Sequence, residues 1–192
     1  MLQTILFIDG ENFLHKIDDV LKEKSIRRKT IEIAKIDFNL LFSTPLEDFK
    51  IDRKIFYAAK LTIHPDTPKK SKELIKLQRK LRNNLINQGF EFIIAGKVRG
   101  QKVGDKIIFK EKGVDVQIAV DLVSLACDKK LDKAILCSSD SDLQPAIKEV
   151  RNRNVEVTYL GFEVKPNKGL MYTTNRMALF RNAEILEACG IK

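Results

Sequence analysis

The sequence predicts an α/β protein of three layers, in which helices cover both faces of a mostly parallel central sheet. Two observations lead to this prediction. Short apolar runs of strand length alternate along the chain with longer stretches of helical periodicity. The most periodic stretch, residues 68–88, carries leucines that form one apolar stripe: Leu74, Leu77, Leu81 and Leu85. Strands separated by helices pair in parallel, because each helix returns the chain to the same end of the sheet.

The first third of the chain is expected to begin with a strand at residues 4–8 and to continue in a helix from about Asn12. A basic loop at 25–30 then leads into a short helix at 37–42. This helix ends before a proline, because the residue that precedes a proline avoids the helical conformation. The apolar run at 54–59 predicts a second strand.

The middle third carries the long helix at 68–88, which Gly89 ends in the usual way. A third strand is expected at 90–95. The segment 96–111 contains three glycines among many basic residues, and it predicts a β-excursion. Residues 114–128 predict a helix with apolar side chains nearly all round, and such a helix is normally buried.

The last third is expected to return to the sheet with a buried strand at 134–138. A helix at 143–153 follows, with a proline tolerated in its first turn. Another strand is expected at 155–160. The tail is predicted to close with a helix at 178–183 and a short apolar element at 185–188.

Size indicates a globular protein, and charge favours a polyanion as its binding partner. The chain has 192 residues with no repeat or low-complexity linker, so we expect one domain over residues 1–192. Its 35 Lys and Arg residues exceed its 26 Asp and Glu residues and give a net charge of +9. Such a surface attracts polyanions, nucleic acid first among them. No apolar stretch approaches the roughly 20 residues needed to cross a bilayer, so no membrane partner is expected.

The amino terminus and the cysteines predict a cytoplasmic protein. Met1 leads straight into a predicted strand, without the basic region and cleavage site of a signal peptide. Cys127, Cys137 and Cys189 fall inside predicted helices or strands, and none is paired at metal-ligand spacing. We therefore expect reduced, buried thiols.

Three acidic segments lie where a predicted strand ends or a predicted helix begins. Asp9 follows the first strand, Asp115 opens the apolar helix, and Asp140 and Asp142 follow the strand at 134–138. Groups just past the carboxyl ends of parallel strands converge on one crevice. Crowded carboxylates repel one another, and a hard divalent ion such as Mg²⁺ or Mn²⁺ relieves that repulsion. The sequence therefore predicts a metal site for phosphate chemistry.

Each of these residues also has a structural interpretation. Asp9 precedes a glycine, a common turn pair, and Asn12 serves either as a helix cap or as the partner that orients Asp9. Asp115 is placed to cap the apolar helix through its free amide groups. Asp140 and Asp142 belong to a Ser-Asp-Ser-Asp run that is a good capping sequence for the next helix.

Asp121 is a further aspartate of the apolar helix. It lies six residues after Asp115, about 600° further around the helix axis, so the two side chains do not share a face. Its neighbours Val120 and Leu122 are apolar, and a buried carboxylate needs a partner. A structural partner, a lysine or a backbone amide, is favoured over a metal role.

Other chemistries find less support in the sequence. His15 and His64 have no cysteine or glutamate at ligand spacing. The Gly-x-Ser-x-Gly elbow of a serine hydrolase is absent. The glycine-rich loops that bind mononucleotides and dinucleotides are absent as well.

Two basic groups are candidates for contact with nucleic acid. The first lies on the polar face of the helix at 68–88 and comprises Lys69, Lys72, Lys76 and Arg79. The second belongs to the segment that leads into Asp115 and comprises Arg99, Lys102 and Lys112. A solvated helix face explains the first group equally well. Aromatic residues are sparse and tryptophan is absent, which favours backbone contact over base stacking.

Four motifs follow one another along the chain: Phe7-Ile8-Asp9-Gly10-Glu11-Asn12, Lys112-Gly113-Val114-Asp115, Ser138-Ser139-Asp140-Ser141-Asp142 and Val157-Thr158-Tyr159-Leu160-Gly161. Together they resemble the NYN domain family, the LabA-like members of the PIN-like nuclease superfamily. The resemblance implies a Rossmann-like three-layer fold and a metal-dependent ribonuclease site. It places Asp9, Asp115, Asp140 and Asp142 at the acidic positions and Asn12 beside the first. Asp121 also matches a typical family aspartate, whereas Ser139 and Leu143 depart from residues common in the family.

We therefore expect a metal-dependent nuclease that hydrolyses phosphodiester bonds, with RNA preferred to DNA as its substrate. One alternative is a non-catalytic nucleic-acid-binding or scaffold protein on the same fold. Another is a phosphotransfer enzyme or receiver-type domain, although its phosphatase form needs an aspartate where this chain has Glu11. The sequence leaves open the RNA target, the polarity of cleavage, the number of metal ions and the oligomeric state, a homo-oligomer included.

Overall fold

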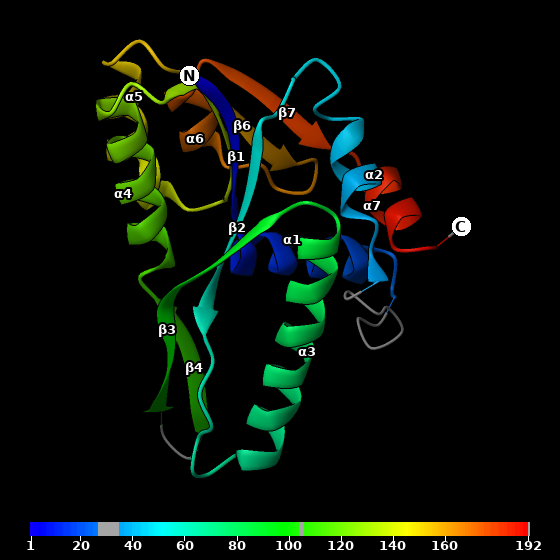
Figure 1. Ribbon diagram of the computed structural model, residues 1–192. Helices are drawn as coiled ribbons and strands as arrows, with labels where there is room; N and C mark the ends of the chain where they lie inside the picture. The colour runs from blue at the N-terminus through cyan, green and yellow to red at the C-terminus, as the bar shows by residue number, and fades with distance from the viewer. Residues whose placement is uncertain (27–34, 104–105, 192) are drawn as a thin grey trace.

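A computed structural model describes residues 1–26, 35–103 and 106–191, apart from the side chains of residues 99, 101–103 and 106–108. Its centre is a seven-stranded sheet with the strand order β4-β3-β2-β1-β5-β6-β7 (Figure 1). The strands are β1 (Gln3–Asp9), β2 (Arg53–Lys60), β3 (Glu91–Val103), β4 (Lys106–Lys112), β5 (Leu131–Cys137), β6 (Glu156–Phe162) and β7 (Arg176–Phe180). All neighbours pair in parallel except β3 and β4, which form an antiparallel hairpin.

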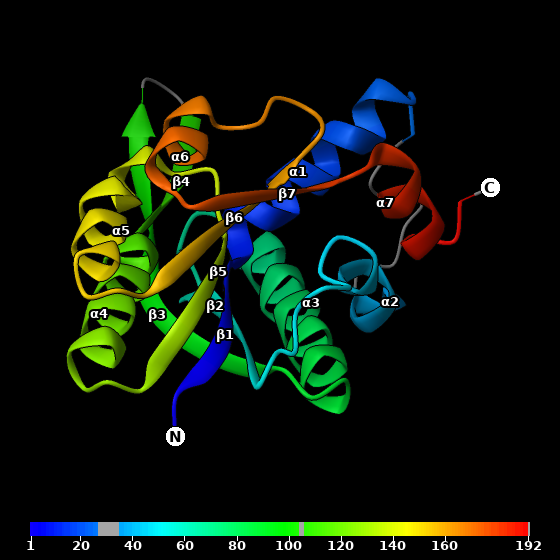
Figure 2. The ribbon, with the colours of Figure 1, turned by 90° about the horizontal axis from the view of Figure 1, so that it is seen from above.

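Helices cover both faces of this sheet. They are α1 (Gly10–Glu23), α2 (Phe38–Ser43), α3 (Pro68–Asn87), α4 (Val114–Cys127), α5 (Gln144–Arg151), α6 (Lys168–Thr173) and α7 (Asn182–Ala188), with a 3₁₀ turn at Ser141–Leu143. One buried core joins the sheet to α1, α2, α3 and α7, and a second joins its other face to α4, α5 and α6 (Figure 2). The predicted three-layer α/β fold with a mostly parallel sheet is confirmed.

Most predicted elements coincide with observed ones. The β-excursion expected at 96–111 is the β3–β4 hairpin, in which Lys97 is the partner of Lys112. The basic loop expected at 25–30 lies almost wholly outside the described residues. None of the described helices has the length and apolar character that a membrane crossing requires.

The tail differs from the prediction. Residues 176–180 form the edge strand β7, and the last helix is α7, so the helix predicted at 178–183 is wrong. The reason is a long-range contact that a local pattern does not contain. Phe180 is fully buried and its ring lies 4.9 Å from that of Phe162 on β6, which fixes this segment as a strand beside β6.

The helix α4 is less buried than its composition predicts. Val114, Ile118, Leu122 and Ala126 face the sheet, but Val116 and Val120 are exposed. Since α4 belongs to an outer layer, it packs against the sheet on one side only. Its apolar residues on the other side therefore remain accessible.

The helix α3 carries the predicted leucine stripe, but the stripe is covered over only half its length. Leu81 and Leu85 are buried, whereas Leu74 and Leu77 are exposed. The pairing of β2 with β3 ends at Lys60 and Lys97. The β3–β4 hairpin continues past this point without a β2 neighbour. Figure 1 shows the first half of α3 running beside this projecting hairpin, past the end of β2.

Candidate metal centre

Three carboxylates converge past the carboxyl ends of the central strands. Oxygen atoms of Asp115, Asp140 and Asp142 lie within 4.8 Å of one another. Asp115 comes from the first turn of α4, Asp140 from the loop after β5, and Asp142 from the 3₁₀ turn that precedes α5. Three of the four predicted ligands therefore lie together past the carboxyl ends of the strands, as expected. We call the place where Asp115, Asp140 and Asp142 meet the acidic crevice.

The loop after β5 is held by its own hydrogen bonds. The backbone amide of Asp140 donates to Oγ of Ser138 (3.1 Å), and the amide of Asp142 donates to Oδ1 of Asp140 (2.9 Å). Asp140 is thus the cap of the 3₁₀ turn as well as a member of the cluster. The capping interpretation made for this residue from the sequence is therefore confirmed, and its part as a metal ligand stays a prediction.

Asn167 supports the same loop from the segment between β6 and α6. Its Nδ2 donates to the carbonyl oxygen of Ser139 (2.8 Å) and to Oγ of Ser141 (2.9 Å). Its own amide donates to the hydroxyl of the buried Tyr159 (3.0 Å). Sequence reasoning missed Asn167, although its position before the helix α6 is typical of a cap, and it does cap α6 through Oδ1.

Asp115 has no capping role. The helix α4 begins after Gly113, whose φ of 99° suits glycine, and no side chain of the capping residue bonds to the first turn. The amide of Val114 instead donates to the carboxylate of Glu111 (2.9 Å). Asp115 therefore projects from the positive end of α4 toward Asp140 without a competing capping bond.

Asp9 lies deeper than the other three acids. It is buried, and its carboxylate accepts bonds from the amide of Asn12 (3.2 Å), from Nδ2 of Asn12 (2.6 Å) and from Oγ of Ser138 (3.1 Å). Burial raises the pKa of Asp9; these bonds oppose that rise, and the negative charge of Asp140 adds to it. Asp9 is the cap of α1, and Asn12 is the residue that orients its carboxylate. Their direct part in catalysis stays a prediction.

The helix α1 can start immediately after Asp9 because Gly10 has no side chain. A Cβ atom at this position would overlap the ring of Phe56 and the carbonyl oxygen of Tyr57 on β2. The glycine lets α1 lie close against β2, which keeps the Asp9 carboxylate beside Ser138.

Glu111 is a second residue that sequence reasoning missed. Burial raises the pKa of Glu111, the bond from Val114 opposes the rise, and the charges of Asp9, Glu11 and Asp115 add to it. The negative charges of Asp9, Glu11 and Asp115 therefore act on the carboxyl group of Glu111. Its place three residues before Val114 was a usable signal, because that is the spacing of a helix-capping side chain.

Asp121 points away from the cluster into a polar contact between α4 and the sheet. Its Oδ2 accepts from the hydroxyl of Tyr57 (2.8 Å) and its Oδ1 from Nε2 of Gln117 (2.8 Å). Burial and the bond to Asp121 raise the pKa of Tyr57 well above its usual value. A structural partner was expected from the sequence, and Asp121 has two, but they are a tyrosine and a glutamine rather than a lysine or an amide of the backbone.

Replacing Tyr57 with phenylalanine is expected to lower the free energy of unfolding by about 1.5–3 kcal/mol, since the change removes a buried hydrogen bond to a carboxylate. Urea denaturation measures the loss. Tyr172→Phe is the matched control, because Tyr172 is exposed and its hydroxyl should contribute little. Equal stability of the two variants would mean that the bond to Asp121 does not hold α4 in place.

The predicted basic residues lie on the projecting part of the molecule. Lys69, Lys72, Lys76 and Arg79 are exposed on α3, and Lys112 is exposed at the end of β4. Arg99 and Lys102 have their backbone in β3, but their side chains lie outside the described part of the chain. Whether these residues bind nucleic acid stays a prediction.

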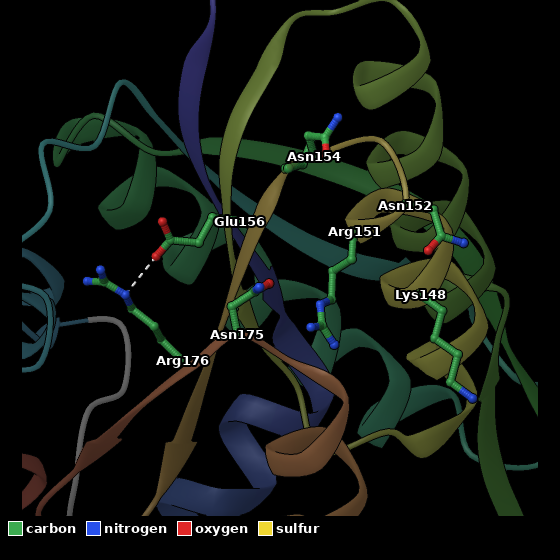
Figure 3. A pocket seen from close by; sticks show the side chains of 8 residues that line it. Lys148, Arg151, Asn152, Asn154, Glu156, Asn175 and Arg176 are labelled. Atoms are coloured by element: carbon green, nitrogen blue, oxygen red, sulfur yellow. Dashed lines mark ion pairs between the residues drawn. The ribbon is translucent and has the colours of Figure 1, made fainter.

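A cavity of about 710 Å³ lies at the amino ends of the strands, where β6 begins, at the other end of the sheet from the clustered acids (Figure 3). Its arginines are engaged with the protein. Arg151 donates to the carbonyl oxygen of Thr173 (2.5 Å), and Arg176 pairs with Glu156 at 2.8 Å. This cavity contains none of the clustered acids, so size alone does not make it the functional site.

The chemistry of the donors fits a divalent ion. Asp115, Asp140 and Asp142 offer hard oxygen ligands, and Asp142 is exposed to solvent. The charge of Asp140 raises the pKa of Asp9, and that of Asp115 raises the pKa of Glu111, so the acids of this region repel one another. A bound cation would relieve this repulsion.

Comparison with known proteins agrees with this arrangement. The family model of the NYN domain matches residues 3–178, nearly the whole chain. The crystal structure of a protein of unknown function from Vibrio parahaemolyticus has a similar fold, with a TM-score of 0.62 and 19% identity over 93% of each chain. No curated protein matches significantly. The match of the family model establishes that this chain belongs to the NYN domain family.

Proposed function

We propose that this chain is a metal-dependent nuclease that hydrolyses phosphodiester bonds in RNA. The observation that carries the proposal is the convergence of Asp115, Asp140 and Asp142 within 4.8 Å at the carboxyl edge of the sheet. Membership of the NYN domain family, which is nuclease-like, supports the same conclusion. The ion is Mg²⁺ or Mn²⁺, because both prefer carboxylate ligands.

Each acidic residue has a separate task in this proposal. Asp115 and Asp140 hold the ion directly, while the exposed Asp142 holds it directly or positions the attacking water. The ion, when bound, lowers the pKa of a water molecule and offsets charge on the scissile phosphate. Asp9 accepts hydrogen bonds from Ser138 and Asn12, and its task is that of a further ligand at the buried side of the site.

The charge of the protein supports a nucleic acid as the substrate, and the resemblance of the motifs to a ribonuclease family favours RNA. The net charge of +9 attracts a polyanion, and exposed lysines lie on α3 and on β4 beside the acidic crevice. Cations on a separate surface hold the phosphate backbone, so the acids remain available for the metal. No base-specific recognition is needed for this contact.

The test is incubation of the purified protein with RNA and DNA oligomers in Mn²⁺ and in a chelator. We expect RNA to be cut in Mn²⁺, DNA to be cut more slowly, and all cutting to stop in chelator. Binding of RNA without any cutting would support a non-catalytic nucleic-acid-binding protein instead. A phosphorylated aspartate formed from a phosphoryl donor would support a phosphotransfer enzyme.

A further inference from the structure

The projecting part of the molecule contains an apolar pocket that the metal site does not use. It has a volume of about 260 Å³ and lies between α1, α3, β2 and the β3–β4 hairpin. Its walls are mostly aliphatic and aromatic: Leu14, Phe56, Leu74, Leu77, Phe92 and Phe109. We call this cavity the hairpin pocket.

The hairpin pocket explains why α3 leaves half its stripe uncovered. Leu74 and Leu77 are exposed because they face this cavity and not the sheet. Large apolar side chains that gather in a concave surface mark a binding site, whereas single exposed ones need no explanation. The pocket therefore needs an occupant with an apolar face.

One end of the pocket lies beside Asp9. Gly10 and Glu11 line it, and they directly follow Asp9 in the chain. Asp9 is linked to Asp140 through the hydroxyl of Ser138, which donates to Asp9 and accepts from the amide of Asp140. An occupant at this end of the pocket therefore lies near the acidic residue that borders the cluster.

The far end of the pocket is basic. A small second cavity shares Leu61, Leu74 and Phe109 with it and continues to Ser71, His64 and Lys70. The Nζ atom of Lys70 lies 6.0 Å from the centre of the Phe109 ring. An apolar groove with a cation at its end is complementary to a molecule that carries flat apolar groups on an anionic backbone, because the groups fill the groove and the cation binds the backbone.

We propose that the hairpin pocket binds one unpaired base of a single-stranded nucleic acid whose backbone continues from the acidic crevice toward Lys70. The proposal rests on the proposed nuclease function for the position of the scissile phosphate. A base has an apolar face that packs on aromatic rings and a polar edge that needs hydrogen-bonding partners. The pocket offers both, since His15, which pairs with Glu11, and Gln78, whose Nε2 donates to the carbonyl oxygen of Ala59, also line it. A duplex hides its bases and does not enter.

This proposal changes the expectation drawn from composition. Aromatic residues make up only 7% of the chain, which argued against base stacking. The fold nevertheless brings Phe56, Phe92 and Phe109 together from β2, β3 and β4. The local concentration of rings decides whether a base can bind, and the overall fraction does not.

The test is a binding measurement with a short fluorescein-labelled RNA of mixed sequence and with versions that each carry one abasic position. A chelator is present, so that anisotropy reports binding without cleavage. Leu77→Glu is the pocket variant and Ile86→Glu is its control. Both side chains are on α3 with similar exposure, 40% and 44%, both variants gain the same charge, and only Leu77 lines the pocket. Leu74→Glu provides a second pocket variant.

We expect one abasic position to weaken binding to the wild-type protein about tenfold. Leu77→Glu should weaken binding of intact RNA by a similar factor beyond the loss that Ile86→Glu causes, and it should weaken binding of that abasic RNA no more than Ile86→Glu does. Ile86→Glu should weaken both RNAs equally. Additive effects of Leu77→Glu and the abasic position would overturn the proposal, because independent losses mean that the base and Leu77 do not meet.

The outcomes separate this proposal from the nuclease proposal. RNA cutting in Mn²⁺ together with additive binding losses would remove the hairpin pocket as a base site and leave the nuclease intact. Coupled binding losses without cutting would establish the base site and remove the nuclease. Equal binding of a matching duplex by Leu77→Glu and Ile86→Glu is also expected, and a loss in Leu77→Glu confined to the duplex would contradict the pocket.

Discussion

Replacing Asp140 with asparagine is expected to lower the rate of RNA cleavage in Mn²⁺ by at least about a hundredfold. Loss of a partner that only supports a metal ligand already costs about 10–100-fold, so loss of a ligand charge costs at least as much. The introduced amide would keep an oxygen that can accept the bond from the backbone of Asp142, so the 3₁₀ turn should survive. Cleavage of a labelled RNA measures the loss, and circular dichroism checks the fold.

The matched control for this prediction is Asp132→Asn. Asp132 is exposed near the amino end of β5, at the edge of the sheet opposite Asp140, and its replacement changes the net charge by the same amount. The control should cut RNA at the wild-type rate. Cutting by purified Asp140→Asn at that same rate would remove Asp140 from the metal site.

The convergence of the acids was predictable because it depends on topology. Asp9 ends β1 and Asp140 follows β5, and these two strands are parallel neighbours, with Ile8 opposite Cys137. Residues that follow paired positions must lie at the same edge. Asp115 reaches this edge because α4 starts where the β3–β4 hairpin ends.

Which of the acidic side chains is buried and which are accessible was not predictable from the sequence. Asp9 and Asp140 look alike in sequence, yet Asp9 is buried behind Ser138 and Asn12, while Asp115, Asp140 and Asp142 form the open cluster. The difference arises from the close packing of α1 on β2 at Gly10 and from the turn after β5. Both are three-dimensional contacts, and spacing along the chain does not report them.

Supporting residues were missed for a related reason. Glu111 and Asn167 are polar residues in connecting segments, and such residues are common without a role. Glu111 matters because the hairpin turns back toward Asp115, and Asn167 because the segment after β6 folds over the Ser139–Ser141 loop. Only the register of β3 with β4 and the packing of α6 bring them there.

Saturating Mn²⁺ is expected to raise the thermal unfolding temperature by about 5–10 °C. A ligand at about a hundred times its dissociation constant stabilises the folded state by about 2.7 kcal/mol, and each kcal/mol shifts the midpoint by about 2–4 °C for a chain of this size. The folded protein offers three carboxylates within 4.8 Å, an arrangement that the unfolded chain lacks. Differential scanning fluorimetry with and without chelator measures the shift.

The shift should disappear in Asp115→Asn and persist in Asp132→Asn. In chelator, Asp115→Asn should melt close to wild type, because the change removes a repelling charge and no capping bond, and this offsets the lost interaction with the positive end of α4. This pairing of outcomes is specific to a metal site: a residue that merely supports the fold would lower the melting temperature in chelator when replaced. An equal Mn²⁺ shift in wild type and Asp115→Asn would place the ion elsewhere on the protein, and the acidic crevice would then be no metal centre, whatever RNA the protein binds.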